Sequence, residues 1–369
     1  MSSPGASIPV QSERILLQQD KMSQSLPAAG AAVARAASRQ TTGIVIPVYL
    51  PPGGDNSAGV VLLADNLAAC VAAVDDPKTI CLAVDGDDCG AQEARRMAQT
   101  HGVGLVVGPQ NRGKLHALRL GVAQLAADDN LHWFATIDAD GDHFANELMN
   151  LVRAGIYAST QRGATGVHVI GRRISRHRPM GWLRGELEEL ADRVLLDALA
   201  YAAVARDRPL RLALATTMDE YPDFHSGFKL FSRAIMESVF LQEPDLCGVD
   251  ETAYYRHGCE AVMTVEANLA GADLVLVNRT TLNEQPVSTF GRLDRERLVA
   301  DKIIWPCRRL GVPPHFLDQW LRNHIPRLLL TTLVPEGKRE LVAIRELIAA
   351  EYDLPRVDDD ELTAGPLFL

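Results

Sequence analysis

Residues 132–143 read HWFATIDADGDH, an apolar run that ends in three carboxylates at alternate positions. The run is short and rich in β-forming residues, so we expect a strand over 133–137. Asp138, Asp140 and Asp142 would then follow the carboxyl end of that strand, where open α/β sheets bind their ligands. Carboxylates held this close repel one another unless a cation lies between them. The stretch predicts a site for Mg²⁺ or Mn²⁺, which take oxygen ligands, although an acidic, solvated turn has the same pattern.

Strands and helices alternate before this stretch. Apolar runs predict strands at 43–49, 79–84 and 104–108, and helical spacing predicts helices at 59–74, 91–101 and 111–127. Strict alternation of this kind is typical of an α/β fold with a mostly parallel central sheet flanked by helices. The pattern is less regular afterwards, with helices expected at 147–159, 185–205 and 232–240 and strands at 166–171, 227–231 and 274–277.

Three regions follow from these patterns. Residues 1–40 are rich in Ser, Gln and Ala and are expected to form a flexible or loosely helical arm. Residues 41–290 form one α/β domain in two halves, divided at residue 145. Residues 291–369 form a C-terminal helical region that we expect to pack on that domain or on a second copy of the chain, as a homo-oligomer.

Composition excludes several classes of protein. The 369 residues carry a net charge of −10, which argues against a general nucleic-acid binder. There is no run of eighteen apolar residues, so we expect no integral membrane segment. The six cysteines form no Cys-x-x-Cys pair, which argues against a zinc site or a disulfide framework and favours the cytoplasm.

Polar residues also follow the other predicted strands. Asp85 ends the strand at 79–84 and can accept hydrogen bonds from a ribose or a base, or cap a turn. Asn111-Arg112-Gly113-Lys114 opens a helix, where backbone N–H groups attract anions, and the two cations suit phosphate; an exposed basic turn is the plainer alternative. The chain has neither a P-loop nor a Gly-x-Gly-x-x-Gly sequence, which argues against those two nucleotide-binding classes.

Four of these segments, taken in order, resemble a known family. They are Ile46-Pro47-Val48-Tyr49, Val84-Asp85-Gly86-Asp87, Asn111-Arg112-Gly113-Lys114 and Asp138-Ala139-Asp140. The set resembles the nucleotide-binding half of GT-A fold glycosyltransferases, in particular family-2-like members, which use nucleotide-diphosphate sugars. The resemblance implies a Rossmann-like GT-A domain with residues 41–145 as nucleotide-binding half and 146–290 as acceptor half. It implies donor binding by Pro47, Tyr49, Asp85, Asn111, Lys114 and Asp138, with Mg²⁺ or Mn²⁺ on Asp138 and Asp140.

The second half resembles the polyprenol-phosphate sugar synthases in this family. Gly171-Arg172-Arg173, Gly181-Trp182 and the segment from Asp223 to Phe231 carry the likeness. Those enzymes have a metal-binding glutamine where this chain has Asp142, so the resemblance implies Asp142 as a further ligand. It also implies that Ser226 and Lys229 contact the acceptor or the diphosphate. The chain departs from these enzymes in having no membrane helices and a long C-terminal helical region, which leaves a lipid-phosphate acceptor unsupported.

Residues 172–184 hold a cluster of arginines. Arg172, Arg173 and Arg176 are the members that we expect to bind an anionic acceptor or the product diphosphate, because arginine binds phosphate and carboxylate through two N–H groups. A solvated loop with these arginines paired to Glu186, Glu188 and Glu189 is the alternative.

Two further candidates lie later in the chain. Asp250 and then Glu251 resemble the acidic pair of inverting members and are candidates for the base that deprotonates the acceptor; a helix N-cap is the alternative. His225 resembles the late histidine ligand of mannosylglycerate synthase-type enzymes, although a lone histidine is also often structural. His143 either closes the metal site or caps the helix that follows it.

The predicted function is a metal-dependent glycosyltransferase. It would move a hexose from GDP-mannose or a UDP-sugar to a small acceptor or to one that carries phosphate or carboxylate. One alternative is a sugar-phosphate nucleotidyltransferase, although such enzymes have a glycine-rich loop after the first strand and this chain has Val48-Tyr49-Leu50-Pro51-Pro52. The other alternative is a degenerate protein that binds sugar nucleotides without catalysis.

Overall fold

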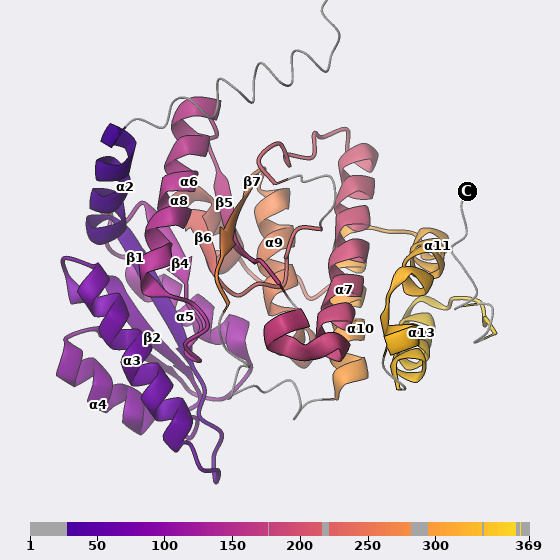
Figure 1. Ribbon diagram of the computed structural model, residues 1–369, viewed down its shortest axis with the longest axis horizontal. Helices are drawn as coiled ribbons and strands as arrows, with labels where there is room; N and C mark the ends of the chain where they lie inside the picture. The colour runs from indigo at the N-terminus through magenta and orange to yellow at the C-terminus, as the bar shows by residue number, and fades with distance from the viewer. Residues whose placement is uncertain are drawn as a thin grey trace, which may run out of the picture.

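A seven-stranded sheet forms the centre of the protein (Figure 1). The computed structural model describes residues 28–175, 177–215, 221–281, 294–333, 336–358 and 362. The strands are β1 (Thr42–Val48), β2 (Ile80–Asp85), β3 (Gly104–Gly108), β4 (Trp133–Thr136), β5 (Val167–Arg173), β6 (Lys229–Ser232) and β7 (Asp273–Arg279). Their order is β3-β2-β1-β4-β6-β5-β7, and neighbours are parallel except that β6 is antiparallel to β4 and β5. The predicted mostly parallel α/β sheet flanked by helices is confirmed.

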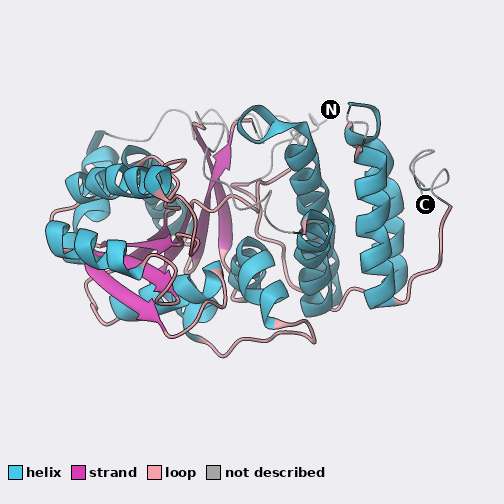
Figure 2. Ribbon diagram, turned by 90° about the horizontal axis from the view of Figure 1, so that it is seen from below, coloured by secondary structure: helices cyan, strands magenta, loops and turns pink. Residues whose placement is uncertain are grey.

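Helices cover both faces of the sheet, as Figure 2 shows. The longer ones are α2 (Ala28–Gln40), α3 (Ser57–Ala73), α4 (Ala91–His101), α5 (Lys114–Ala126), α6 (Leu148–Arg162), α7 (His177–Ala205), α9 (Cys259–Leu269), α10 (Arg295–Leu310), α11 (Pro314–His324) and α13 (Gly337–Tyr352). The short ones are α8 (Arg233–Met236), α12 (Leu330–Leu333), η1 (Pro77–Thr79), η2 (Ala145–Glu147), η3 (Glu237–Leu241), η4 (Thr252–His257) and η6 (Ile325–Arg327).

The alternation of side chains along β1 divides the core into two layers. Ile44 and Ile46 point to one face and pack in a cluster with residues of α3, α4 and α6. Val45 points to the other face and packs in a cluster with residues of α5, α7, α9 and α10. All three side chains are fully buried, and successive residues of a strand point to opposite faces. A strand that is buried on both faces has a continuous run of apolar residues in its sequence, and this run is why β1 could be predicted.

The C-terminal helices pack on the α/β domain. Helix α10 contacts α7, α9 and η4, and α13 contacts α10 on the side away from the sheet (Figure 1). The two helices α10 and α13 are joined by an ion pair between Arg308 and Glu351, 2.8 Å apart. At the other end of the chain, residues 28–40 of the expected arm form helix α2, which packs against α6.

Helices α7 and α9 differ from the expected elements. Helix α7 begins at His177 instead of residue 185, with a break at Gly181, where φ is 76° and ψ is 166°. Helix α9 was not predicted. Most of its residues are buried, so its sequence shows no one-sided apolar stripe with helical spacing.

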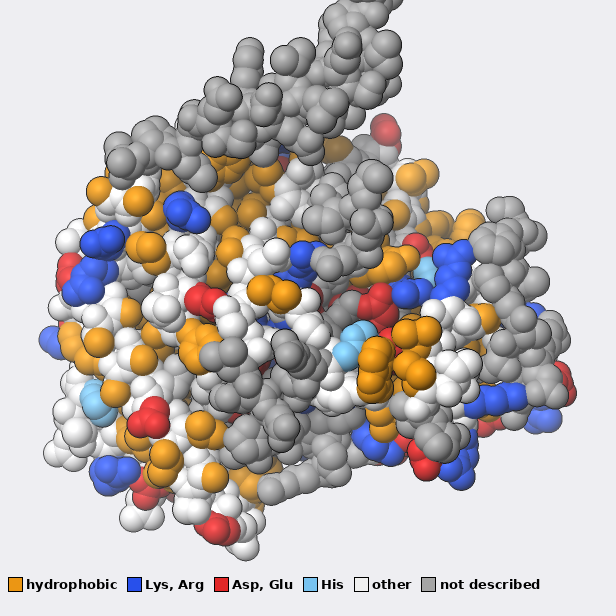
Figure 3. Space-filling view, in the orientation of Figure 1, with side chains coloured by type: hydrophobic (Ala, Val, Ile, Leu, Met, Phe, Trp, Pro, Cys, Tyr) orange, Lys and Arg blue, Asp and Glu red, His pale blue; other side chains and the backbone are white. Residues whose placement is uncertain are grey.

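The six cysteines are free thiols. Among the described residues, the structure contains no helix that is both long and apolar enough to cross a membrane. On the face drawn in Figure 3, basic and acidic side chains are interspersed.

Candidate functional site

The four parallel strands β1 to β4 end at the same edge of the sheet. Val48 pairs with Val84, and Asp85 pairs with Gly108, so the ends of β1, β2 and β3 are aligned. Pro47 is half-buried in β1, and Tyr49, just past the strand, is 45% exposed. The sheet therefore brings Pro47, Tyr49 and Asp85, three of the predicted donor-binding residues, to one edge.

Asp85 shapes the turn that leads into α5. One carboxylate oxygen accepts hydrogen bonds from the backbone N–H groups of Arg112 (2.6 Å) and Gly113, and the other lies 2.6 Å from Nδ1 of His116. Both carboxylate oxygens are therefore engaged within the protein, and the residue is buried. The structure thus shows the turn-capping alternative for Asp85, and its contact with a nucleoside stays a prediction.

The turn at 111–113 is joined to the segment that carries the predicted base. Nε of Arg112 donates to Oε2 of Glu251 at 3.0 Å, and Nη2 of Arg256 donates to Oδ1 of Asn111 at 2.9 Å. A Cβ atom on Gly113, where φ is 138°, would lie 2.7 Å from the carbonyl oxygen of Tyr255, so only glycine fits there. The structure thus engages Glu251 in an ion pair, which makes Asp250 the better candidate for the base.

Lys114 lies between two carboxylates. Its Nζ is 2.7 Å from Oδ1 of Asp138 and 2.8 Å from Oε1 of Glu260 on α9. Burial lowers the pKa of Lys114, but Asp138 and Glu260 outweigh it and hold that pKa well above the usual value. A Cβ on Gly227 would lie 2.5 Å from Oδ2 of Asp138, so the chain before β6 closes tightly over the pair. The first turn of α5 therefore places a permanent positive charge beside Asp138.

His143 positions Asp138. Its Nδ1 accepts a hydrogen bond from the backbone N–H of Asp138 at 2.8 Å, and its ring stacks on Phe228. Asn66 donates to the carbonyl oxygen of Asp138 at 2.7 Å. Burial and the nearby charge of Arg279 hold the pKa of His143 well below its usual value, so the ring is neutral. His143 and Asn66 therefore fix the loop that follows β4.

Asp140 and Asp142 have different surroundings. Oδ1 of Asp140 accepts a hydrogen bond from the backbone N–H of Asp142 at 3.1 Å, and burial and then Asp138 raise the pKa of Asp140 to about 6. Asp142 is buried and its Oδ2 lies 2.9 Å from Nη2 of Arg279, at the end of β7. Like-charge crowding at Asp138 and Asp140 fits a divalent cation that takes its other ligands from water and substrate phosphates.

The four predicted metal ligands do not come together, which corrects that expectation. Asp142 is paired with Arg279, and His225 is fully buried with its Nδ1 2.7 Å from Oδ1 of Asp192 on α7. Within the described ranges, no group of three or more His, Cys, Asp and Glu side chains is arranged to hold a metal ion. The candidate ligands that remain are Asp140 and Asp138, the latter with one oxygen against Lys114.

The predicted acceptor-binding cations are largely engaged inside the protein. Arg173 is buried and donates from Nε to Asp223 at 2.8 Å and from Nη2 to Glu188 at 2.7 Å. Arg172 donates to Asn278 at 2.9 Å. For Arg173 the structure thus favours the alternative of pairing with carboxylates, which are Glu188 and Asp223, whereas Arg172 meets the amide oxygen of Asn278. Arg176 lies outside the described residues.

Ser226 and Lys229 are engaged as well. The hydroxyl of Ser226 donates to the carbonyl oxygen of Gly171 at 2.6 Å, and Nζ of Lys229 donates to the carbonyl oxygen of Phe224 at 2.8 Å. Lys229 is fully buried, which lowers its pKa to about 8. The buried positions of both side chains indicate that they hold the chain between α7 and β6, and contact with an acceptor stays a prediction.

Asp250 is exposed and begins a helical turn. Its Oδ1 accepts a hydrogen bond from the backbone N–H of Ala253 at 2.7 Å, as an N-cap does. The N-cap alternative is therefore present. Because the cap uses Oδ1, the other carboxylate oxygen of Asp250 remains as the candidate base.

Sequence reasoning missed Glu260 and Arg279. Glu260 lies on the unpredicted helix α9, and Arg279 lies two residues beyond the predicted end of β7. Neither belongs to a motif, and each meets its partner across more than a hundred residues of chain, Lys114 for Glu260 and Asp142 for Arg279. No local pattern could have identified them.

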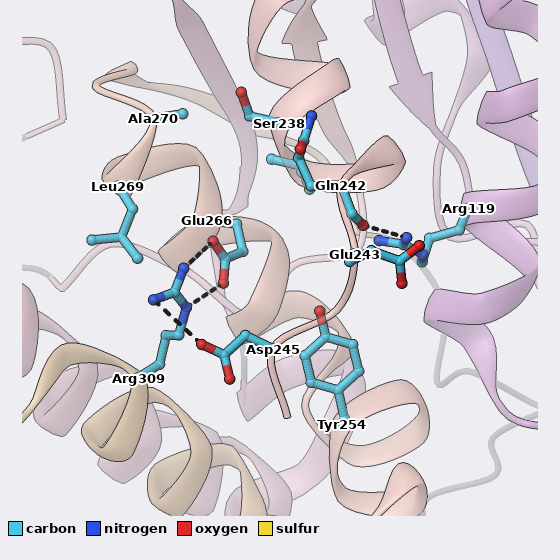
Figure 4. A pocket seen from close by; sticks show the side chains of 11 residues that line it. Arg119, Ser238, Gln242, Glu243, Asp245, Tyr254, Glu266, Leu269, Ala270 and Arg309 are labelled. Carbon is cyan, nitrogen blue, oxygen red and sulfur yellow. Dashed lines mark hydrogen bonds and ion pairs between the residues drawn. The ribbon is translucent and has the colours of Figure 1, made fainter. Parts of the chain in front are cut away.

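A separate cavity of about 270 Å³ lies between α5, α9, α10 and η3 (Figure 4). Arg119, Tyr254, Glu266 and Arg309 are among the residues that line it, and Arg309 donates to both oxygens of Glu266. Its lining contains none of the predicted site residues. This cavity is therefore distinct from the candidate site at the sheet edge.

Comparisons with known proteins give only distant likenesses. No family model matches the sequence, and no curated protein matches it significantly. A solved structure of a mycobacterial protein has 17% identity and a TM-score of 0.44, and the match covers 78% of this chain and 81% of the other. TarS from S. aureus has 13% identity and a TM-score of 0.41, with 84% and 82% covered. The 4-diphosphocytidyl-2C-methyl-D-erythritol synthase from Anaerococcus prevotii has 12% identity and a TM-score of 0.37, with 73% and 97% covered.

Proposed function

We propose that this protein is a glycosyltransferase that moves a hexose from a nucleotide-diphosphate donor, GDP-mannose or a UDP-sugar, to a small anionic acceptor. The observation that carries the proposal is the meeting of Lys114 with Asp138 at the carboxyl edge of the sheet, beside Asp140. A diphosphate at the N-terminus of α5 would meet Lys114 and backbone N–H groups. Tyr49, half-exposed at the same edge, would face the nucleoside.

Asp138 and Asp140 would hold the divalent cation, Mg²⁺ or Mn²⁺. When bound, the cation supplies positive charge that stabilises the leaving diphosphate. Lys114 contributes a charge of the same sign from the protein, and Glu260 keeps its ammonium group at the site. His143 and Asn66 hold the backbone of Asp138, so its carboxylate keeps its direction.

Asp250 is the candidate base. Its exposed carboxylate lies at the start of a helical turn. The contact between Glu251 and Arg112 joins this turn to the donor side of the site. A base there would take the proton of an acceptor hydroxyl during attack on the sugar.

Replacement of Asp250 by asparagine is expected to leave nucleotide binding unchanged and to lower transfer by about 10²–10⁴-fold. Asparagine caps a helix as well as aspartate does, so the turn should keep its fold. The measurement is release of nucleoside diphosphate from a donor sugar with water as the acceptor, together with donor affinity. Asp245→Asn, in the preceding loop, is the matched control. If Asp250→Asn turns over as fast as the control, the base is another group.

A further inference from the structure

The cavity between α5, α9, α10 and η3 is not used by the proposed function. Its volume of about 270 Å³ lies just below the range of about 300–1,000 Å³ that is typical of small-molecule sites. Val239 of η3 and Leu269 of α9 give it an apolar wall, and Arg119, Glu243 and Tyr254 bring polar groups to it (Figure 4). An apolar wall with a small number of polar groups is the usual lining of a small-molecule site. The cavity therefore has the size and lining to hold a small ligand.

Arg119 and Glu243 are opposite charges on the cavity wall that do not pair with each other. Nη2 of Arg119 donates to the carbonyl oxygen of Gln242 at 2.6 Å, and Glu243 is the next residue along the chain. Within the part of the chain that the structure describes, neither Arg119 nor Glu243 forms an ion pair. A guanidinium group has five N–H donors, so Arg119 has donors left after its bond to Gln242. These two side chains can therefore receive an anionic and a cationic group of one ligand.

Tyr254 adds a fixed hydroxyl group to the same cavity. Only 2% of the residue is exposed, and its ring lies edge-on to those of Tyr255 and Trp305, with centroids 4.9 and 5.4 Å away. The hydroxyl end points into the cavity (Figure 4), and no hydrogen bond of this group is found among the described residues. Burial raises the pKa of Tyr254, so the hydroxyl keeps its proton at neutral pH and can donate it in a hydrogen bond to a ligand.

The opposite wall of the cavity is closed by an ion pair between Arg309 and Glu266 (Figure 4). Nε and Nη2 of Arg309 donate to the two carboxylate oxygens of Glu266 at 2.7 and 3.0 Å, and Nη1 of Arg309 lies 3.8 Å from Asp245. A two-point pair of this kind is among the stronger hydrogen-bonded contacts in proteins. Arg119 and Glu243 are therefore the lining charges that a ligand would meet without competing with an existing ion pair.

We propose that this cavity binds a free α-amino acid, with its carboxylate on Arg119 and the hydroxyl of Tyr254 and its ammonium group on Glu243. An α-amino acid carries both charges on one carbon atom, which suits two opposite charges that lie on either side of the Gln242 carbonyl. A simple anion would be repelled by Glu243, and a simple cation would be repelled by Arg119. Val239 and Leu269 would face the side chain of the ligand. The site does not depend on the proposed function.

The test is calorimetric titration of each of the common L-amino acids into the full chain, with no nucleotide present. We expect at least one of them to bind, and Arg119→Met or Glu243→Gln to weaken that binding by at least about tenfold, because a charge-assisted contact is lost. Tyr254→Phe should weaken it by about two- to tenfold, since one neutral hydrogen bond is lost while the ring stays. Arg153→Met is the matched control and should bind as the wild type does, because Arg153 is an exposed residue of α6, on the other face of the sheet.

Thermal unfolding without ligand checks that each variant is folded, and Arg119→Lys, which keeps the charge, should retain more binding than Arg119→Met. Acetate and methylammonium carry one charge each and should bind at least about tenfold more weakly than the best amino acid. Three results would overturn the proposal: no amino acid binds the wild-type chain, Arg119→Met binds the best amino acid as tightly as the wild type does, or acetate binds as tightly as that amino acid.

Discussion

Replacement of Asp140 by alanine is expected to abolish Mn²⁺-dependent binding of nucleoside diphosphate while the chain stays folded. Among the three carboxylates of this stretch, Arg279 holds Asp142 and Lys114 lies against one oxygen of Asp138, whereas the contact of Asp140 is with the backbone N–H of Asp142. Removal of one of two protein ligands should weaken metal-dependent binding by at least about a hundredfold, because even groups that only orient a ligand change affinity by 10–100-fold. Asp140 makes one backbone contact in the protein, so its loss should cost little stability.

The measurement is calorimetric titration of GDP and UDP into the protein, with and without Mn²⁺. Asp129→Ala is the matched control, because Asp129 is exposed and lies just before β4, at the opposite end of that strand. The assignment of Asp140 to the metal fails if Asp140→Ala and Asp129→Ala bind with the same Mn²⁺-dependent affinity.

Replacement of Arg173 by methionine is expected to lower the free energy of unfolding by about 3–5 kcal/mol, the usual cost of removing one partner of a buried ion pair. The guanidinium group of Arg173 donates to Asp223 and Glu188, and the three side chains are each at most 3% exposed. Methionine fills a similar volume but leaves Asp223 buried without its cation. Glu188 keeps Arg184 and Lys302, so the main penalty falls on Asp223.

The measurement is the free energy of unfolding in urea of Arg173→Met, with Arg96→Met as the control. Arg96 is an exposed residue of α4 that pairs with Glu93, and such surface pairs contribute at most about 1 kcal/mol. An equal loss in both variants would show that Arg173 acts as a surface residue and is open to an anionic ligand, as the sequence predicted.

The first half of the fold could be predicted because each strand there is an apolar run that ends in a turn. The strand at 104–108 and the helix at 91–101 have the expected bounds, since Gly102 and Gly108 end them. The carboxyl edge could be predicted for the same reason: parallel strands that alternate with helices end on one side. Asp85, Lys114 and Asp138 were placed at this edge correctly.

The second half could not be predicted to the same degree, because its contacts depend on distant pairing. Strand β6 was expected at 227–231, but its antiparallel position between β4 and β5 has no local pattern in the sequence. Arginines 172 and 173 looked available for a ligand, and only the fold shows that Asp223 and Asn278 meet them. His225 was a candidate ligand for the same reason, and Asp192 on α7 meets it inside the core.

The most direct test of the account is a thermal-shift screen of the full chain with GDP, UDP, GDP-mannose and UDP-sugars, each with and without Mn²⁺. Ligand binding to the folded state raises the unfolding midpoint. The account predicts a rise that requires both a nucleotide and the metal, and the preferred base then identifies the donor. A midpoint that no combination of nucleotide and Mn²⁺ changes would contradict the proposal that this sheet edge binds a nucleotide-diphosphate sugar.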